Sequence, residues 1–504
     1  MSLLEEIAAL ELESRKLDPP EEDLRRMMKK AEDVVLTSLK HSRGDGVPHD
    51  PAWRYSGPNA GKELEDDGLD DEPKDLDEIL QLLDRNVLRE GGNHSSPRFF
   101  GWVPGPCMYP AAIGDYIVAA ASRFAGYYLA NPGAVRMENM LVRWAIQNVA
   151  GYDTKTAFGF LSSGASMATV SAFLCARDKH EVLTNPDVPA HRRTVYITQE
   201  VHACAQKALW LTGACAVVQR YVPSDDSCRM IVSALEAMVK EDVAAGLVPW
   251  MVVGTAGTVN TGSVDPLEEI AAVAKEYKMW FHVDGAYGGM LKLCPEGQQV
   301  LKGLELSDSM AADPHKAMFV PQGTGLLMVR DGAQLKKSHS LSAHYLQPFA
   351  EVPDDMISSS SVSPELTKHF RAMRMWLPLK VFGLKSIKAA MSEKILLARY
   401  FYDVMSKDDR FQLGPYPDLS IASYRLILPS IGDSTQRLAE ENNINDALLQ
   451  ATLRDGSCFI TVTTVKGVLW LRICVLQFRC HKADVDQLIS VLKREGGALL
   501  GVRG

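Results

Sequence analysis

The chain has 504 residues, which is enough for about three domains of ordinary size. Its composition, 46% hydrophobic and 23% charged, is that of a globular protein. The 54 basic and 63 acidic residues give a formal net charge of −9, which argues against a nucleic-acid surface or a polybasic membrane anchor. No apolar run approaches the roughly 20 residues of a membrane-spanning helix. The acid-containing N-terminus also lacks the pattern of a signal peptide. These features exclude a collagen, a coiled-coil rod, a membrane protein and a small disulfide scaffold.

The nine cysteines are scattered along the chain, and no two of them form a Cys-x-x-Cys pair. An odd number of cysteines without regular spacing predicts neither a disulfide framework nor a zinc site. We therefore expect reduced thiols in a cytoplasmic protein.

The first 90 residues predict helices joined by polar loops. Apolar residues recur with helical spacing over residues 4–17 and 24–39. An acidic stretch at residues 62–78 then leads into a further helical pattern at residues 77–88. A run of like charges is usually a solvated segment, so we expect a loop there and not an acidic recognition tail.

From about residue 91 to residue 340, strand-like runs alternate with helical patterns. A helix is expected over residues 265–277, where Asp265 can cap and Pro266 suits the first turn. The alternation predicts a mostly parallel sheet with helices on both faces. Runs of β-branched and aromatic residues predict its strands at 193–198, 215–222, 250–258 and 279–287.

The last part of the chain has a pattern of its own, with strands predicted at 425–430, 458–465 and 468–478 and a helix at 483–496. This pattern indicates a small α+β domain. We therefore predict an α/β fold in three parts, with a helical N-terminal segment at 1–90, a large α/β domain at 91–390 and a small α+β domain at 391–504.

Residues that follow strand-like runs are the first functional candidates, because ligands of open α/β sheets bind beyond the carboxyl ends of the strands. Ala165 and Ser166 begin a helical pattern, whose unpaired N–H groups can bind an anion such as phosphate. Asp284 ends a strand pattern, where a buried carboxylate needs a cationic partner. Each has an ordinary alternative, a capped helix in the first case and a structural hydrogen bond in the second.

Two further residues carry chemistry of a different kind. Lys316 follows His315 in a short polar insert, and a lysine in a water-poor pocket can form a Schiff base with an aldehyde. His202 follows another strand-like run, and its flat ring can stack on a planar group or act as an acid or base. Taken singly, a surface lysine and a structural histidine are the usual interpretations. A metal site at Asp284 lacks further ligands, so no metal is expected.

Together these residues form the set that a pyridoxal phosphate site requires. The phosphate needs a helix N-terminus, the ring needs a stacking partner, the pyridine nitrogen needs a carboxylate and the aldehyde needs an amine. The combination, more than any single residue, indicates this cofactor.

With these residues placed, the chain resembles the group II pyridoxal-phosphate decarboxylases, a branch of the fold type I (aspartate-aminotransferase-like) enzymes. The resemblance covers most of residues 30–495 and is closest in motif to the aromatic L-amino-acid decarboxylases. The motifs are PRFFGWVPGPCMYPA (97–111), SSGASMAT (162–169), VHACAQKA (201–208), GTAGTVNTGSVDPL (254–267), FHVDGAYGG (281–289) and DPHKAMFVPQGTG (313–325).

The resemblance implies an enzyme that decarboxylates an L-amino acid, by preference an aromatic one, with pyridoxal 5'-phosphate as cofactor. It implies that Lys316 bonds the cofactor's aldehyde, that Asp284 pairs with the pyridine nitrogen and that His202 stacks on the ring. It also implies a homodimer in which the N-terminal helices of two subunits wrap around each other. The remaining cofactor contacts would come from Ala165, Ser166 and His315 at the phosphate and from Ala286 under the ring.

Two segments bear on the substrate and the outcome of the reaction. Tyr345 stands in a polar, Ser-rich segment that is similar to the family's mobile lid, whose tyrosine returns a proton to the substrate carbon. Relatives with Phe there tend to release an aldehyde, so Tyr345 favours simple decarboxylation. Trp102, Val103 and Pro104 align with the wall that receives the substrate side chain, where Val103 replaces the usual Phe of the animal enzymes.

Four alternatives remain open from the sequence. They are decarboxylation of a non-aromatic amino acid such as glutamate or histidine, aldehyde-forming oxidative decarboxylation, a carbon–carbon lyase reaction with the same cofactor, and a non-catalytic relative. The lyase relatives usually carry a membrane helix. The presence of Lys316 and Asp284 argues against a non-catalytic relative.

Overall fold

The computed structural model describes residues 2–44, 50–69, 71–103, 105–340, 350–428 and 434–501. The chain forms two compact units, a smaller one of Met1–Phe99 with Gly456–Phe459 and a larger one of Phe100–Asp455 with Ile460–Gly504. The predicted division into three domains stays a prediction. Over the described ranges, no helix is both long and apolar enough to cross a membrane.

The smaller unit is mainly helical and has little interior of its own. Its first helix begins with a capping box, in which Ser2 and Glu5 exchange side-chain and backbone hydrogen bonds. None of the residues of that helix is buried. The elements of the unit are α1 (Leu3–Ser14), α2 (Glu21–Arg43), α3 (Lys62–Asp67), α4 (Leu76–Leu83), β1 (Trp53–Arg54) and β2 (Gly91–Gly92).

Helix α3 corrects the expectation that the acidic stretch is a loop throughout. Lys62 pairs with Asp66 across one turn at 2.6 Å, and such a pair at spacing i, i+4 supports a helix locally. Gly61 and Gly68, both at positive φ, bound the six helical residues. All six are solvated, so the charges still do not form a buried site.

The larger unit contains a sheet of seven strands in the order β3-β9-β8-β7-β6-β4-β5. The strands from β8 through β5 pair in parallel, and β9 runs antiparallel to both of its neighbours, which confirms the mostly parallel sheet. The strands are β3 (Phe158–Ser162), β4 (Arg193–Ile197), β5 (Val218–Tyr221), β6 (Val248–Thr255), β7 (Trp280–Gly285), β8 (Ser309–Ala312) and β9 (Gly325–Val329).

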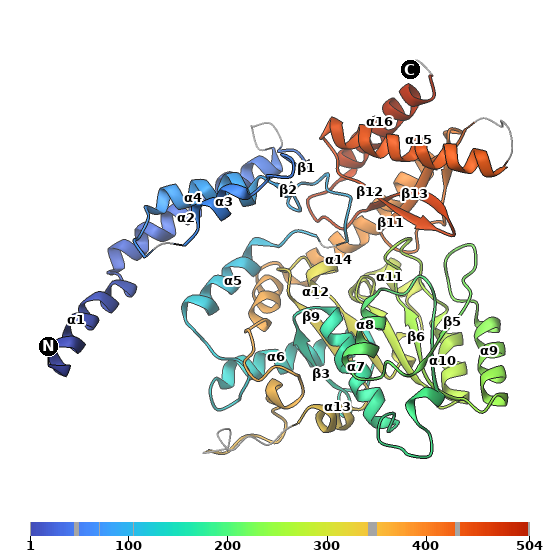
Figure 1. Ribbon diagram of the computed structural model, residues 1–504, viewed down its shortest axis with the longest axis horizontal. Helices are drawn as coiled ribbons and strands as arrows, with labels where there is room; N and C mark the ends of the chain where they lie inside the picture. Colours follow the sequence, from blue (N-terminus) through green and yellow to red (C-terminus); the bar gives the residue numbers. More distant parts are fainter. Residues whose placement is uncertain are drawn as a thin grey trace. The chain divides into compact units, whose positions relative to one another are not determined.

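The helices of this unit cover both faces of the sheet (Figure 1). They are α5 (Tyr109–Ala120), α6 (Pro132–Ala145), α7 (Ala165–Lys179), α8 (Cys204–Leu211), α9 (Val232–Ala244), α10 (Leu267–Glu276), α11 (Pro295–Val300), α12 (Pro314–Ala317) and α13 (Gly332–His339).

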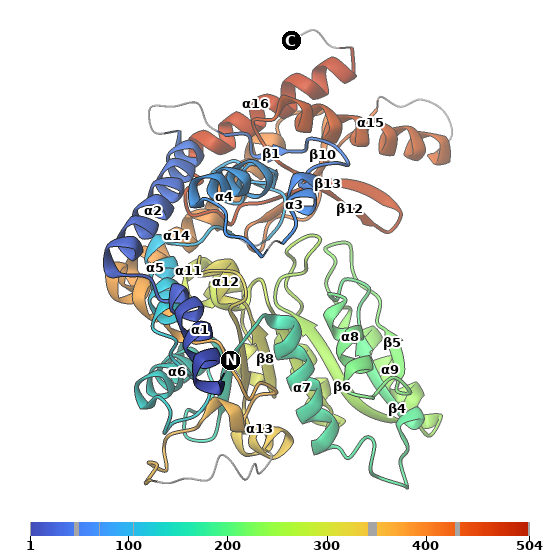
Figure 2. The same ribbon diagram turned by 60° about the vertical axis from the view of Figure 1, so that its left-hand side comes forward.

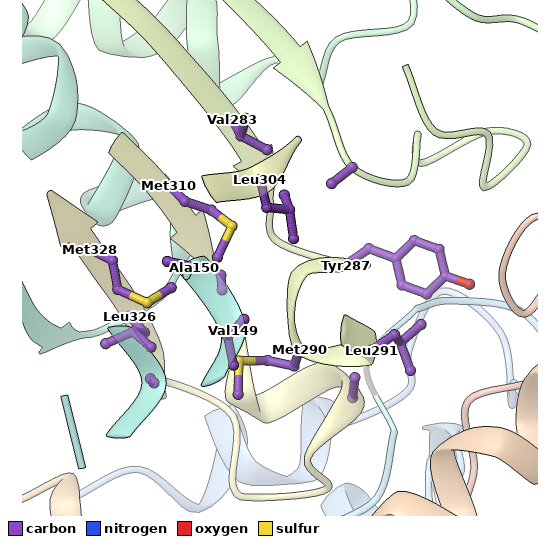
Figure 3. Packing of buried hydrophobic residues seen from close by; sticks show 14 of the residues in the cluster. Val149, Ala150, Val283, Tyr287, Met290, Leu291, Leu304, Met310, Leu326 and Met328 are labelled. Atoms are coloured by element: carbon purple, nitrogen blue, oxygen red, sulfur yellow. The ribbon is translucent and has the colours of Figure 1, made fainter. Parts of the chain in front are cut away.

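Two separate apolar clusters form the core, one on each face of the sheet. Phe160 and Val195 pack with α7 and α8 on one face, whereas Leu161 and Val252 pack with α6, α9 and α10 on the other. Side chains alternate along a strand, so the neighbours Phe160 and Leu161 enter opposite clusters. Met310 lies in the second cluster, among other sulfur-containing and branched side chains that fill the space beneath the strands (Figure 3).

Asp265 does not cap α10, contrary to the sequence-based expectation. The residue before the helix is Pro266, and no side chain caps the first turn. The fully buried Asp265 carboxylate instead accepts hydrogen bonds from the backbone N–H groups of Met230 and Thr255, both at 2.8 Å. Burial raises the pKa of Asp265 to about 6. The side chain thus joins two segments that are distant in sequence.

The C-terminal part is an antiparallel sheet of four strands in the order β10-β11-β13-β12, with two helices, as expected for a small α+β layer. The strand predicted at 425–430 lies earlier, at Ile421–Leu426. The long helix α14 leads into this part and carries a kink at Gly383, whose φ is 71°. The elements are α14 (Ala372–Met405), α15 (Ser434–Asp455), α16 (Lys482–Leu499), β10 (Phe411–Leu413), β11 (Ile421–Leu426), β12 (Thr461–Val465) and β13 (Val468–Cys474).

Candidate active site

The candidate residues meet at the carboxyl edge of the seven-stranded sheet. A cavity of about 50 Å³ is lined by residues at or after the ends of β3, β4, β6, β7 and β8, and by Val103. Parallel strands bring these ends together although they are far apart in sequence. The lining comprises Val103, Ala165, Ser166, His202, Cys204, Thr255, Gly257, Val259, Asp284, Ala286, Tyr287, Asp313 and Lys316.

Lys316 stands on α12, the single short turn that follows β8. Its side chain is 18% exposed, and its Nζ lies 3.1 Å from Oδ2 of Asp313. Asp313 is almost fully buried, and its Oδ1 accepts the Ala165 N–H at the start of α7 at 2.6 Å. The carboxylate therefore links the amine to the helix N-terminus, which orients both toward the cavity.

Asp284 is the second-to-last residue of β7 and is 5% exposed. Its Oδ1 accepts the Ala286 N–H at 3.1 Å, and its Oδ2 lies 3.9 Å from the Cys204 thiol. Burial raises the pKa of the Cys204 thiol well above its usual range, so the thiol stays protonated and can donate. No cationic side chain in the described part of the chain forms an ion pair with Asp284. A buried carboxylate in this position calls for a cation from a ligand.

His202 lies in the loop between β4 and α8. Its Nδ1 accepts the Cys204 N–H at 3.1 Å, so Nδ1 is unprotonated and Nε2 carries the proton in the neutral ring. This contact fixes the orientation of a ring that is otherwise exposed in the single chain. The structure thus places a planar, partly solvated ring at the mouth of the cavity.

The start of α7 adjoins the short helix that carries Lys316. His315 donates from Nδ1 to the Thr324 carbonyl at 2.9 Å and lies beside the same Asp313 carboxylate. Gly325 allows this close approach, because a Cβ there would lie 2.5 Å from the Cα of Gly164. Ser166 is exposed, and its side chain lines the cavity.

The remaining sequence candidates lie differently. Val103 is buried and lines the cavity, whereas Trp102 is 45% exposed and is not part of the lining. Pro104 and Tyr345 lie outside the described residues. The roles assigned to these side chains therefore stay predictions.

Several lining residues were missed by the sequence analysis. Asp313 precedes the predicted lysine and stood in a quoted motif, but only its fold-dependent contact with Ala165 reveals a part in the site. Thr255 ends β6, and its buried Oγ1 has no hydrogen-bond partner. The rule that strand ends form the site could have singled out Thr255. Nothing in the sequence pointed to Cys204.

These features fit pyridoxal phosphate. Lys316 offers an amine for its aldehyde, Asp284 offers a buried carboxylate for its ring nitrogen, and the start of α7 at Ser166 offers a helix N-terminus for its phosphate. The Thr255 hydroxyl lines the same cavity without a hydrogen-bond partner, so it can serve as a polar contact for a ligand.

The comparison with known families agrees with this geometry. The pattern of the pyridoxal-dependent decarboxylase conserved domain matches residues 58–427. The chain belongs to this family. It is therefore a decarboxylase that uses pyridoxal phosphate as its cofactor.

Curated relatives of known activity match nearly the whole chain. The aromatic-L-amino-acid decarboxylase of Bacillus atrophaeus is 28% identical over 480 residues, which cover 95% of this chain and 97% of that protein. The phenylacetaldehyde synthase of Petunia hybrida is 25% identical over 441 residues, covering 85% and 86% of the two chains.

A solved structure shows the same fold. The tryptophan decarboxylase of Oryza sativa, crystallised with pyridoxal phosphate and tryptamine, superposes with a TM-score of 0.88 at 23% identity. The match covers 96% of this chain and 99% of the other.

Proposed function

We propose that this enzyme removes the α-carboxyl group of an aromatic L-amino acid as CO2 and releases the amine. One observation carries the proposal, namely the buried Asp284 carboxylate that lacks a cation in the same cavity as Lys316. Activity on aromatic amino acids in the relatives from Bacillus and Oryza supports the substrate class.

Lys316 and Asp284 would act on different parts of the cofactor. When bound, pyridoxal phosphate supplies an electron-accepting ring that can hold the electron pair left behind as CO2 departs. Lys316 would hold the cofactor through its aldehyde group. Asp284 Oδ2 holds a proton at the ring nitrogen, and the Ala286 N–H and the Cys204 thiol keep that carboxylate in place.

The neighbouring residues orient the reactants. Ala165 and Ser166 at the start of α7, together with His315, would hold the phosphate, and the His202 ring and Ala286 would pack against the cofactor ring. Tyr345 returns a proton to the substrate carbon, so that a proton replaces the carboxyl group and no oxidant is consumed. Trp102, Val103 and Pro104 form the wall for the substrate side chain.

The apolar character of the cavity wall favours an aromatic substrate over a charged one. Val103, Val259 and Tyr287 all face the cavity, and Val103 and Tyr287 are almost fully buried. A charged substrate side chain placed against such a wall would lose its hydration without a compensating partner. An aromatic ring gains free energy from the same burial.

A homodimer is part of the proposal. Helix α1 displays Leu4 at 77% and Leu10 at 64% exposure, and α2 displays Met27 at 45%. Exposed apolar side chains at helical spacing mark an interface. We assign a second copy of this chain as the partner, because the resemblance of the chain to its family implies that the N-terminal helices of two subunits pair. The nine free cysteines fit a reducing, cytoplasmic location.

The test is to follow CO2 and hydrogen peroxide together after the cofactor-loaded enzyme is mixed with L-amino acids. Tryptophan, tyrosine and phenylalanine are compared with glutamate and histidine. We expect CO2 from an aromatic substrate without peroxide. CO2 from glutamate or histidine alone would contradict the substrate class. No CO2 from any of the five amino acids would contradict the proposed decarboxylation.

Aldehyde formation is the second candidate, because the relatives include phenylacetaldehyde synthases. That reaction consumes O2 and yields peroxide and ammonia with the CO2. Peroxide in proportion to CO2 would therefore establish it and would contradict the role proposed for Tyr345.

A further inference from the structure

A buried arginine joins two walls of the cavity. Arg472, on β13, is 5% exposed, and the described residues offer its guanidinium no carboxylate partner. It donates from Nη2 to the Gly101 carbonyl at 2.6 Å and from Nη1 to the Val259 carbonyl at 2.5 Å. Its Nε has no hydrogen-bond partner. Burying a guanidinium without a counter-ion is costly, so this position needs an explanation beyond packing.

The two carbonyls belong to the segments that line the cavity. Val259 is itself a lining residue, and Gly101 stands two residues before Val103. These carbonyls lie 213 and 371 residues from Arg472 along the chain. Arg472 thus connects two segments that share no strand pairing and no sequence neighbourhood.

The surrounding contacts make β13 the fixed support. Arg472 is paired in register with Ser423 of β11 and with Thr461 of β12, so its backbone lies in the interior of the small sheet. Thr461 Oγ1 also donates to the Gly101 carbonyl, at 2.8 Å, and the Cys474 N–H donates to the Phe100 carbonyl at 2.8 Å. The segment before Val103 is therefore anchored to β13 at two successive residues.

Arg425, on the neighbouring strand β11, is a buried arginine of the same sheet whose role is structural, and it serves as the comparison for Arg472. It is 3% exposed, and its Nη2 forms an ion pair with Glu441 at 2.7 Å. Its contact is with α15, outside the cavity lining. The two arginines match in burial and in sheet, and they differ in whether they contact the cavity walls.

We propose that Arg472 is a positioning residue that fixes the spacing of the Val103 and Val259 segments and thereby sets the ring size that the pocket accepts. The planar guanidinium donates in two directions at once, which holds both carbonyls at a fixed separation. A lysine would keep the charge but would serve the two carbonyls only alternately. The inference rests on the proposed function, because it concerns the substrate of the same cavity.

The test compares Arg472→Lys with the matched control Arg425→Lys, both as cofactor-loaded enzymes. The measured quantity is the ratio of kcat/KM for tryptophan to kcat/KM for phenylalanine. We expect Arg472→Lys to change this ratio by roughly tenfold, the size of effect that small changes in pocket dimensions produce. Arg425→Lys should lower the midpoint of thermal unfolding and leave the ratio unchanged.

A third variant keeps the test decisive if Arg472→Lys does not fold. Thr461→Val removes the second donor to the Gly101 carbonyl, and we expect a shift of the ratio of roughly threefold in the same direction. A ratio that stays at the wild-type value in the folded variants, or that moves equally in Arg425→Lys, would overturn the inference. Wild-type enzyme without activity on either amino acid would instead overturn the proposed function.

Discussion

The two compact units of this protein differ in how completely each buries its own apolar side chains. In the larger unit, all six residues of β7 are buried, and the two faces of the sheet form separate apolar clusters. In the smaller unit, α1, which Figure 2 labels beside the N-terminus, buries none of its residues. Leu17 beyond it is 87% exposed. The smaller unit's helices form from local signals, whereas the larger unit depends on contacts between distant segments. The candidate active site belongs to the larger unit, and the exposed apolar side chains of α1 and α2 belong to the smaller.

The largest expected effect is the loss of chemistry in the larger unit without loss of its fold. Lys316→Ala should lower turnover by at least roughly a thousandfold, because the amine that holds the cofactor is gone. The side chain is near the cavity surface, so the midpoint of thermal unfolding should change little. Lys292→Ala is the control, since Lys292 donates to the Leu301 carbonyl away from the cavity. Equal turnover in the two variants would contradict the assignment.

Local sequence signals predicted the parts of the molecule that depend on local interactions. Helices α1, α2 and α4 and the strands β4, β6 and β7 follow from residue spacing and composition, whereas α3 was predicted to be a loop. The candidate site residues came from strand ends and motifs, which did not single out Asp313, Thr255 or Cys204. Asp265 shows where this reasoning fails, since its buried carboxylate bonds to segments 10 and 35 residues away in place of the adjacent helix. Arg472 shows the same limit, because its contacts exist only after the small sheet has formed.

A buried ion pair in the larger unit gives the second prediction. Lys368 Nζ lies 2.5 Å from Glu138 Oε1, both side chains are buried, and burial lowers the pKa of Lys368. Lys368→Met should lower the free energy of unfolding by roughly 3–5 kcal/mol, because it leaves the Glu138 charge unpaired. Denaturant unfolding measures this change.

The matched control is the double variant Lys368→Met with Glu138→Gln. It removes the unpaired charge, so it should recover part of the loss. A double variant less stable than Lys368→Met would contradict the ion-pair explanation.

The smaller unit gives the third prediction. Leu10→Asp should shift the proposed homodimer toward monomer, because a leucine buried in an interface contributes roughly 1.5–3 kcal/mol. Sedimentation equilibrium measures the dissociation constant. Leu69→Asp is the control, since Leu69 is fully exposed in the acidic stretch. A dimer unaffected by Leu10→Asp would contradict the assignment of α1 to the interface.

The smallest expected effect is a change in how the free energy of unfolding depends on pH, caused by titratable groups in the core of the larger unit. Burial lowers the pKa of His282 from 6.5 to about 4. Between these values the unfolded chain binds the extra proton, so the free energy of unfolding rises with pH from about 4 to 6.5 and is then constant. Asp265, whose pKa burial raises from 3.8 to about 6, contributes the opposite slope over most of this window.

His282→Asn removes the His282 contribution to the pH dependence of the free energy of unfolding. The variant should gain less stability than wild type as pH rises from about 4 to 6.5, because the His282 contribution to the slope is gone, and the difference from wild type amounts to at most about 3 kcal/mol. Urea unfolding at several pH values measures it. His191→Asn, at an exposed position, should leave the wild-type profile unchanged. A His282→Asn profile that matches wild type would contradict the pKa assignment.

The central claim is that the cavity at the carboxyl edge of the larger sheet holds the cofactor through Lys316. The most direct measurement is reduction of the cofactor-loaded protein with borohydride, followed by digestion and mass spectrometry. We expect a phosphopyridoxyl group on the peptide that contains Lys316, and no such label in Lys316→Ala. A label on another lysine, or none while the cofactor is bound, would contradict the account.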